Sequence, residues 1–139
     1  MKKAELLLQC EVVNYCRLLA AGIHPDWPGV SMPALGYIRA SLNGLRMKPR
    51  QVTEMKASGM LVGEPDLFLS VARGGYAGLY VEMKTGGKRS NTSTDQKRVH
   101  TFLRSEGYLV TVHDSVVGAV SEIIAYMSAA PTWCRRSVS

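Results

Sequence analysis

The stretch GEPDLFLSVARGGYAGLYVEMKTGG, residues 63–87, decides the fold of this chain. Its apolar residues predict two strands, over about 66–72 and 79–85, joined by the glycine-rich segment RGGYAG. Charged residues nevertheless occur where these strands should be buried. Asp66 opens the first strand, and Glu82 and Lys84 lie near the end of the second. Because burying an unpartnered ion costs several kcal/mol, these side chains need solvent, one another or a ligand.

The spacing of these charges favours one shared site. Alternation along the second strand places Glu82 and Lys84 on one face, and Asp66 reaches the same point if the two strands pair through the turn. Two converging carboxylates repel each other unless a cation lies between them, and Mg²⁺ and Mn²⁺ prefer such oxygen ligands. The lysine can hold an anionic substrate or position a water. Together these groups are suited to hydrolysing a phosphodiester bond.

The rest of the chain predicts a mixed α/β domain. Helices are expected over residues 3–20, 49–59, 90–107 and 115–129, and further strands over 37–44 and 108–114. In the third helix, Ser93 and Gln96 have the spacing of a capping box, and Val99, Phe102 and Leu103 are expected to form the apolar stripe. Residues 1–130 are interpreted as one domain and residues 131–139 as a polar tail.

Composition narrows the class of protein. The formal net charge of +6 favours polyanionic partners such as nucleic acid, although many basic proteins bind none. No apolar run approaches the roughly 20 residues that span a bilayer. Glu5, Gln9 and Glu11 interrupt the apolar run near the N-terminus, so it is read as an amphipathic helix rather than a signal peptide. A cytoplasmic protein without a membrane segment is therefore expected.

A wider pattern surrounds the charged strands. EPD, fifteen further residues and then EMK place Pro65, Asp66, Glu82 and Lys84 in the PD-(D/E)xK nuclease signature. In order along the chain lie NGLR (43–46), MKASGMLVGEPDLFL (55–69), LYVEMKT (79–85), STDQ (93–96) and EGYLVTV (106–112). Together these segments resemble the VRR-NUC (virus-type replication-repair nuclease) family. The resemblance covers about residues 3–128, and the short chain is similar to the stand-alone form of phages and prophages.

The resemblance implies a restriction-endonuclease-like α/β core, with a mixed central sheet flanked by helices, and cleavage of DNA that depends on Mg²⁺ or Mn²⁺. The implied catalytic residues are Asp66, Glu82, Lys84, Gln96 and Glu5. Asp66 and Glu82 would bind the metal together with the backbone carbonyl of Met83. Glu5 would approach it directly or through water, with Glu11 as its rival. Gln96 is left open between a helix cap, a site residue, or both.

Basic residues near this signature are candidates for contacts with the DNA backbone, although such a charge run can also be a solvated face. They are Arg46, Lys88, Arg89, Lys97 and Arg98. His100, on the third helix, is expected at the surface. Stand-alone members of the VRR-NUC family are similar to Holliday-junction resolvases in forming dimers, so the resemblance also implies a homodimer.

The sequence is therefore interpreted as that of a DNA nuclease selective for branched, flapped or junction DNA in replication, repair or recombination. The alternative is a basic DNA-binding module or partner-dependent nuclease subunit without independent activity, and cleavage of RNA is left open.

Overall fold

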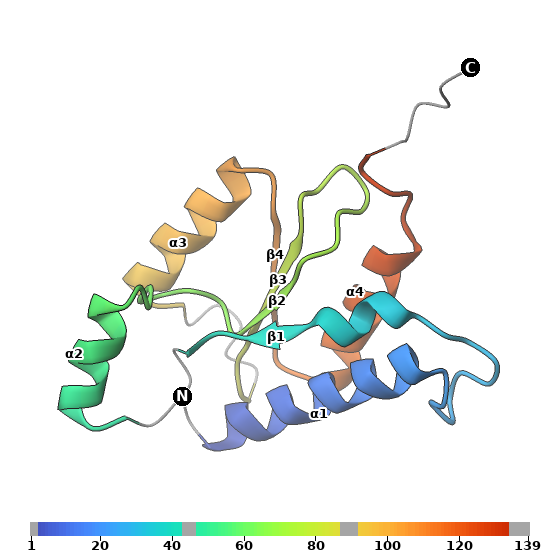
Figure 1. Ribbon diagram of the computed structural model, residues 1–139, viewed down its shortest axis with the longest axis horizontal. Coiled ribbons are helices and arrows are strands. Elements are labelled where there is room, and N and C mark those ends of the chain that lie inside the picture. The colour runs from blue at the N-terminus through green and yellow to red at the C-terminus, as the bar shows by residue number, and fades with distance from the viewer. Residues whose placement is uncertain (1–2, 43–46, 87–91, 134–139) are drawn as a thin grey trace.

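The computed structural model describes residues 3–42, 47–86 and 92–133 (Figure 1). It is a mixed α/β fold, as predicted. Its elements are α1 (Lys3–Ala21), a 3₁₀ helix (Pro33–Tyr37), β1 (Arg39–Ala40), α2 (Pro49–Ala57), β2 (Leu67–Leu69), β3 (Leu79–Met83), α3 (Thr94–Ser105), β4 (Leu109–His113) and α4 (Val116–Ser128).

The four strands form one mixed sheet in the order β1-β2-β3-β4. β2 pairs with β1 and with β3 in antiparallel directions, whereas β3 and β4 run parallel. Antiparallel neighbours need only a turn between them, but parallel neighbours need a crossover, which α3 supplies. The predicted pairing of the two charged strands through the glycine-rich segment is confirmed.

Helices cover the two faces of the sheet unequally (Figure 1). On one face, α1 and α4 pack on alternate strand residues and form the larger core. That core is built from Val12, Cys16, Leu19, Leu67, Leu69, Leu79, Val81, Met83, Ala119, Val120 and Ile123, with other buried apolar residues. On the other face, Val99 and Leu103 of α3 pack on Val110 of β4 in a smaller cluster. Successive residues of a strand point to opposite faces of the sheet, so Asp66 and Glu82 lie on the face that α3 covers.

The strand predicted over residues 37–44 is present but much shorter than predicted. Pro33 begins a 3₁₀ helix that buries Leu35, because proline fixes φ near helical values, and only Arg39 and Ala40 form β1. The other strands are shorter than predicted. Residues 43 and 44 of the expected strand lie outside the described residues.

The predicted apolar stripe of α3 also needs correction. Val99 and Leu103 are buried, but Phe102 is 58% exposed and His100, expected at the surface, is only 3% exposed. The stripe that faces the sheet follows the i, i+3, i+4, i+7 pattern from Gln96, which includes His100 and leaves out Phe102. No helix in the three described ranges is long and apolar enough to cross a membrane.

Candidate active site

The strand register brings the two predicted carboxylates together. Leu67 of β2 lies opposite Val81 of β3, so the preceding residue, Asp66, lies opposite Glu82. Their backbone and side chains are linked reciprocally. The Asp66 N–H donates to Glu82 Oε2 at 3.1 Å, and the Met83 N–H donates to Asp66 Oδ2 at 2.7 Å. Both carboxylates are buried, with Asp66 8% and Glu82 2% exposed.

Gln96 connects the start of α3 to these carboxylates. Ser93 caps the helix by accepting a hydrogen bond from the Gln96 N–H, and Gln96 Oε1 accepts one from the Ser93 N–H at 3.0 Å. The same Oε1 accepts a second hydrogen bond from Lys84 Nζ at 2.9 Å, while Gln96 Nε2 donates to Glu82 Oε1. The helix cap and the contact with the charged cluster, left open as alternatives, are therefore both present.

Lys84 lies just beyond β3, where its backbone N–H donates to the His113 carbonyl at 2.8 Å. Its side chain is only 12% exposed, and Nζ lies 3.6 Å from Glu82 Oε1. A buried ion pair needs additional hydrogen bonds to offset its desolvation, and the Gln96 amide provides one. Lys84 does not line the pocket described next, but it contacts two residues that do.

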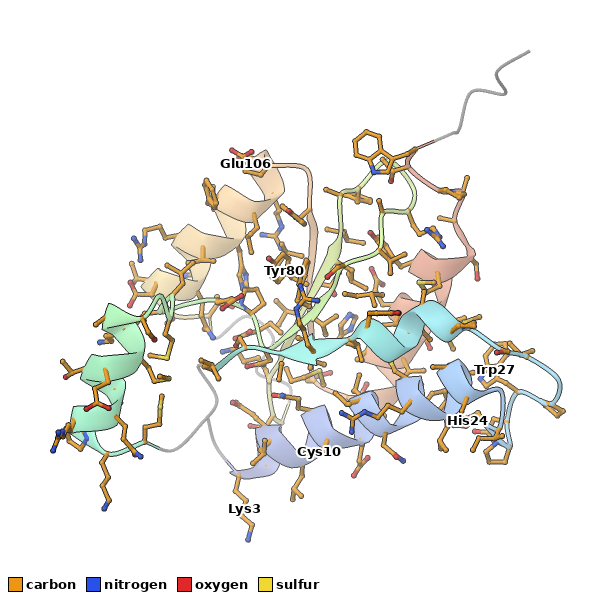
Figure 2. The ribbon with its side chains drawn as sticks, in the orientation of Figure 1. Lys3, Cys10, His24, Trp27, Tyr80 and Glu106 are labelled. Atoms are coloured by element: carbon orange, nitrogen blue, oxygen red, sulfur yellow. The ribbon has the colours of Figure 1, made fainter. Side chains whose placement is uncertain are left out.

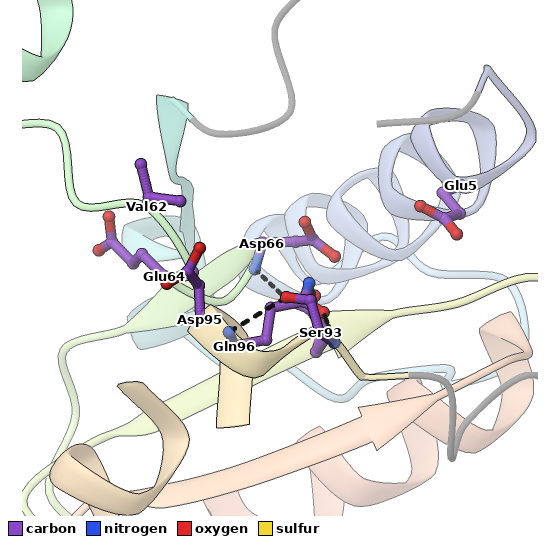
Figure 3. A pocket seen from close by; sticks show the side chains of 9 residues that line it. Glu5, Val62, Glu64, Asp66, Ser93, Asp95 and Gln96 are labelled. Carbon is purple, nitrogen blue, oxygen red and sulfur yellow. Dashed lines mark hydrogen bonds between the residues drawn. The ribbon is translucent and has the colours of Figure 1, made fainter. Parts of the chain in front are cut away.

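These residues face a cavity of about 320 Å³ between α1, β3 and the start of α3 (Figure 3). Its lining residues are Glu5, Val62, Gly63, Glu64, Asp66, Glu82, Ser93, Asp95 and Gln96. Glu5 extends from α1 toward the side of the cavity where Asp66 lies (Figure 3). Glu11 is exposed and does not line the cavity, so the geometry favours Glu5 of the two candidates.

Sequence reasoning missed a close contact in the wall of this cavity. Gly63 has φ +93°, and a Cβ built on it would lie 2.5 Å from the backbone oxygen of Asp95. The segment before Asp66 therefore packs directly on the first turn of α3, and only glycine allows that approach. The signal in the sequence was the glycine three residues before the aspartate, but its contact partner was not evident.

Burial dominates the electrostatics of the two carboxyl groups. It raises the pKa of Asp66 to about 6, with the Met83 N–H opposing this rise and the charge of Glu5 adding to it. Burial raises the pKa of Glu82 to about 8; the charge of Asp66 adds to this rise and that of Lys84 opposes it. Ionising both groups together is therefore unfavourable unless further positive charge is present.

A divalent cation would supply that charge, and the donor set suits a hard ion. Two carboxylates offer oxygen ligands, and Mg²⁺ commonly binds through one or two carboxylates while keeping several waters. Within the described ranges, no group of three or more His, Cys, Asp or Glu side chains is placed to hold a metal. The sequence resemblance gives the place of a further protein ligand to the backbone carbonyl of Met83.

The structure places only some of the predicted DNA-contacting residues. Lys97 and Arg98 lie exposed in the first half of α3, and Arg98 pairs with Asp95 at 3.4 Å. Asp95 lines the cavity, so this basic patch adjoins its mouth. Arg46, Lys88 and Arg89 lie outside the described residues.

The sheet order and the paired acidic strands define an α/β fold of the PD-(D/E)xK type. Among solved structures, the chain matches a VRR_NUC domain protein with a TM-score of 0.71 and 26% sequence identity. The match covers 94% of this chain and 93% of that chain, so the predicted fold and the resemblance to VRR-NUC proteins are confirmed. No family model matches the chain, and no curated protein matches it.

Proposed function

We propose that this protein is a DNA nuclease that hydrolyses phosphodiester bonds with Mg²⁺ or Mn²⁺. One observation carries the proposal. Asp66 and Glu82 are buried side by side at a cavity, with the Lys84 ammonium 3.6 Å from Glu82, in a fold shared with a VRR_NUC domain protein. Purely structural carboxylates are seldom buried as a pair at a cavity, because each raises the cost of ionising the other.

Asp66, Glu82 and the Met83 carbonyl would hold the cation, and Glu5, which lines the same cavity, would contribute through water. A bound divalent ion supplies Lewis acidity, which lowers the pKa of water and offsets negative charge on a phosphate. The protein's own part is to fix the ligands. The Met83 N–H and the Asp66 N–H orient the two carboxylates, so little reorganisation is needed at the site.

Lys84 would act on the phosphate or on the attacking water. Gln96 holds its ammonium through Oε1, beside Glu82, and both of these partners line the cavity. A cation fixed in a water-poor site stabilises developing negative charge more strongly than one in solvent. Gln96 would thus be a positioning residue that acts through Lys84 and Glu82.

The substrate class proposed is DNA with a branched, flapped or junction structure, handled in replication, repair or recombination. The formal charge of +6 and the exposed Lys97 and Arg98 beside the cavity support a polyanionic substrate. We also propose a homodimer, on the strength of the resemblance alone. Analytical ultracentrifugation of the purified protein would test it.

Cleavage assays test the function directly. Labelled duplex, nicked, flapped and four-way DNA would be incubated with Mg²⁺ or Mn²⁺ and the wild type, Asp66→Ala or Lys84→Ala. We expect cleavage by the wild type only, with DNA binding largely retained in both variants. Matched controls are Glu106→Ala, at the far end of α3, and Lys56→Ala on α2, each of which removes the same charge from an exposed position.

Full turnover by Asp66→Ala or Lys84→Ala would overturn the assigned roles. Tight DNA binding without cleavage by the wild type, across metals and substrates, would instead support the alternative of a DNA-binding module or a partner-dependent subunit. Cleavage of RNA but not DNA would keep the chemistry and change the substrate.

A further inference from the structure

A row of three aromatic side chains with an arginine at one end crosses the sheet beside the cavity. Register places Arg39 of β1 opposite Phe68 of β2, and Phe68 opposite Tyr80 of β3. The Phe68 and Tyr80 rings stack with centroids 4.4 Å apart and planes 22° apart, and the Arg39 guanidinium lies 4.6 Å from the Phe68 ring centre. Tyr108 meets Tyr80 edge-on at 5.4 Å. We call Arg39, Phe68, Tyr80 and Tyr108 the stacking row.

The open end of this row is not part of either hydrophobic core. Tyr80 and Tyr108 pack against the small cluster under α3, as Figure 2 shows for Tyr80 between the sheet and that helix. Phe68 is only half-buried and belongs to neither cluster of the described residues. Arg39 is exposed on β1, which is an edge strand. The row therefore runs from beneath α3 out to solvent.

The backbone also makes room for these rings. A Cβ on Gly78 would lie 3.1 Å from the Phe68 ring and 3.2 Å from the Tyr108 ring, both tighter than ordinary contact. The Leu69 backbone oxygen would lie equally close, at 3.2 Å, so both the rings and the neighbouring strand favour glycine at this position, where no left-handed φ is involved. Three aromatic side chains are thus accommodated on one patch of a small sheet.

The row lies next to the proposed catalytic carboxylates. Phe68 follows Asp66 by two residues and Tyr80 precedes Glu82 by two, so each pair shares a face of the sheet. At about 3.3 Å per residue, the rings begin about 7 Å from the carboxylates along the strands. Glu64, which lines the cavity, lies near Arg39, since the Arg39 charge opposes the rise that burial causes in the pKa of Glu64.

We propose that the stacking row binds an unpaired nucleobase beside the phosphate that is cut, so the protein prefers DNA with unpaired nucleotides there. Bases stack on aromatic rings and on guanidinium planes whatever their sequence. The solvent side of Arg39, or the Phe68 face that Arg39 covers, offers such a plane. A base in continuous duplex is already stacked and must be unstacked first, which penalises plain duplex. This proposal rests on the proposed nuclease function.

Binding without metal separates this proposal from catalysis. Fluorescence anisotropy in EDTA would compare a duplex carrying a short single-stranded gap with a continuous duplex of equal length. 2-Aminopurine in the gap would report stacking through loss of its fluorescence. We expect the wild type to bind the gapped DNA about ten-fold or more tightly than the duplex, the order expected for stacking one base, and to quench the probe.

Two variants test the side chains. Arg39→Lys keeps the charge but loses the planar group, and Phe68→Leu keeps apolar bulk but loses the ring. Both should reduce the preference for gapped DNA at least five-fold and weaken quenching. Arg50→Lys on α2, at a fully solvated position, is the matched control and should behave as wild type. If Phe68→Leu unfolds, Arg39→Lys decides alone, because Arg39 is exposed.

The proposal would be overturned if the wild type bound the two DNAs with equal affinity. It would also be overturned if Arg39→Lys and folded Phe68→Leu kept the wild-type preference and quenching. Neither result would bear on any cleavage that is observed. Preference and quenching that depend on the row, in a protein that cuts no DNA, would support base binding and reject the nuclease function. The two failures are therefore distinguishable.

Discussion

At the scale of single residues, the cost of holding two carboxylates in one small volume is the central feature. Asp66 and Glu82 each gain a backbone N–H donor, but burial and mutual repulsion outweigh these hydrogen bonds and raise both pKa values. Such a site is stabilised when a cation binds. Stability and metal binding should therefore be linked through pH.

We predict that this pair makes the metal-free protein less stable as pH rises. In the unfolded chain both groups release their protons near pH 4, whereas in the folded protein the pKa values are raised to about 6 and about 8. Their contribution is fully present below pH 4 and is lost as pH rises toward 8. Chemical denaturation in EDTA should show this fall, and Mg²⁺ should reduce it. A contribution that is flat or rising would contradict the prediction.

Asp66→Asn isolates the effect of one carboxyl group. The amide cannot ionise, so we expect the metal-free variant to be more stable than wild type at pH 8, by about 1–2 kcal/mol, and nearly equal at pH 4. It should also lose cleavage and the stabilisation by Mg²⁺. Comparing the variant with the wild type cancels the pH dependence of groups that both proteins share. One such group is His100, whose pKa is lowered by burial, so that its contribution to stability rises with pH. The prediction would be refuted if the stability of the variant relative to that of the wild type were lower at pH 8 than at pH 4.

At the scale of elements, the first turn of α3 makes direct contacts with the charged residues of the site. Its cap joins Ser93 to Gln96, and Gln96 joins Lys84 to Glu82. The segment that contains Gly63 packs on the same turn. Position and register of this one turn should therefore control activity without any change in the charged residues.

Removing the cap is expected to reduce both stability and activity. Ser93→Ala should cost about 1 kcal/mol, because the Gln96 N–H loses its acceptor, and should lower the cleavage rate by displacing Gln96. Ser115→Ala is a matched control, since Ser115 caps α4 in the same way through the Gly118 N–H, away from the cavity. It should lose similar stability with unchanged cleavage. Equal cleavage rates in the two variants would contradict the role of the cap.

Gly63→Ala should perturb the site through the backbone. Its Cβ would clash with the Asp95 carbonyl, so we expect a loss of about 1–3 kcal/mol in stability and at least a ten-fold loss of cleavage. Gly59→Ala is the control, because Gly59 also has positive φ but a Cβ there would meet no atom of the described residues within 4 Å. That variant should suffer backbone strain of about 1 kcal/mol and keep its activity. Thermal melts and cleavage rates measure both.

Strand periodicity explains what could be predicted at this scale. The convergence of Asp66 and Glu82 follows from period-two alternation and from one antiparallel pairing, both of which are local in sequence. The packing of Gly63 on Asp95 and the burial of His100 depend on where α3 docks, which no local pattern determines. Of the strand expected over 37–44, Tyr37 belongs to the 3₁₀ helix that Pro33 begins, and only Arg39 and Ala40 pair with β2.

At the scale of the whole molecule, charge distribution should matter more than net charge. We predict that the double variant Lys97→Ala/Arg98→Ala weakens DNA binding and lowers the slope of log affinity against log salt by about 2, since each phosphate contact adds about 1. Arg50→Ala/Lys56→Ala on α2 loses the same charge and should change the slope less. Titrations at several salt concentrations measure both. Identical slopes in the two double variants would show that only overall charge acts.

The side-chain amide of Gln96 completes the helix cap, and the same side chain lines the cavity and binds Lys84. Fraying of a helix end is ordinarily a harmless event of low free energy. Here the same fluctuation would release the ammonium and one carboxylate from their shared partner. Warming should therefore abolish the proposed cleavage some degrees before the chain melts, because only the first turn of α3 has to open.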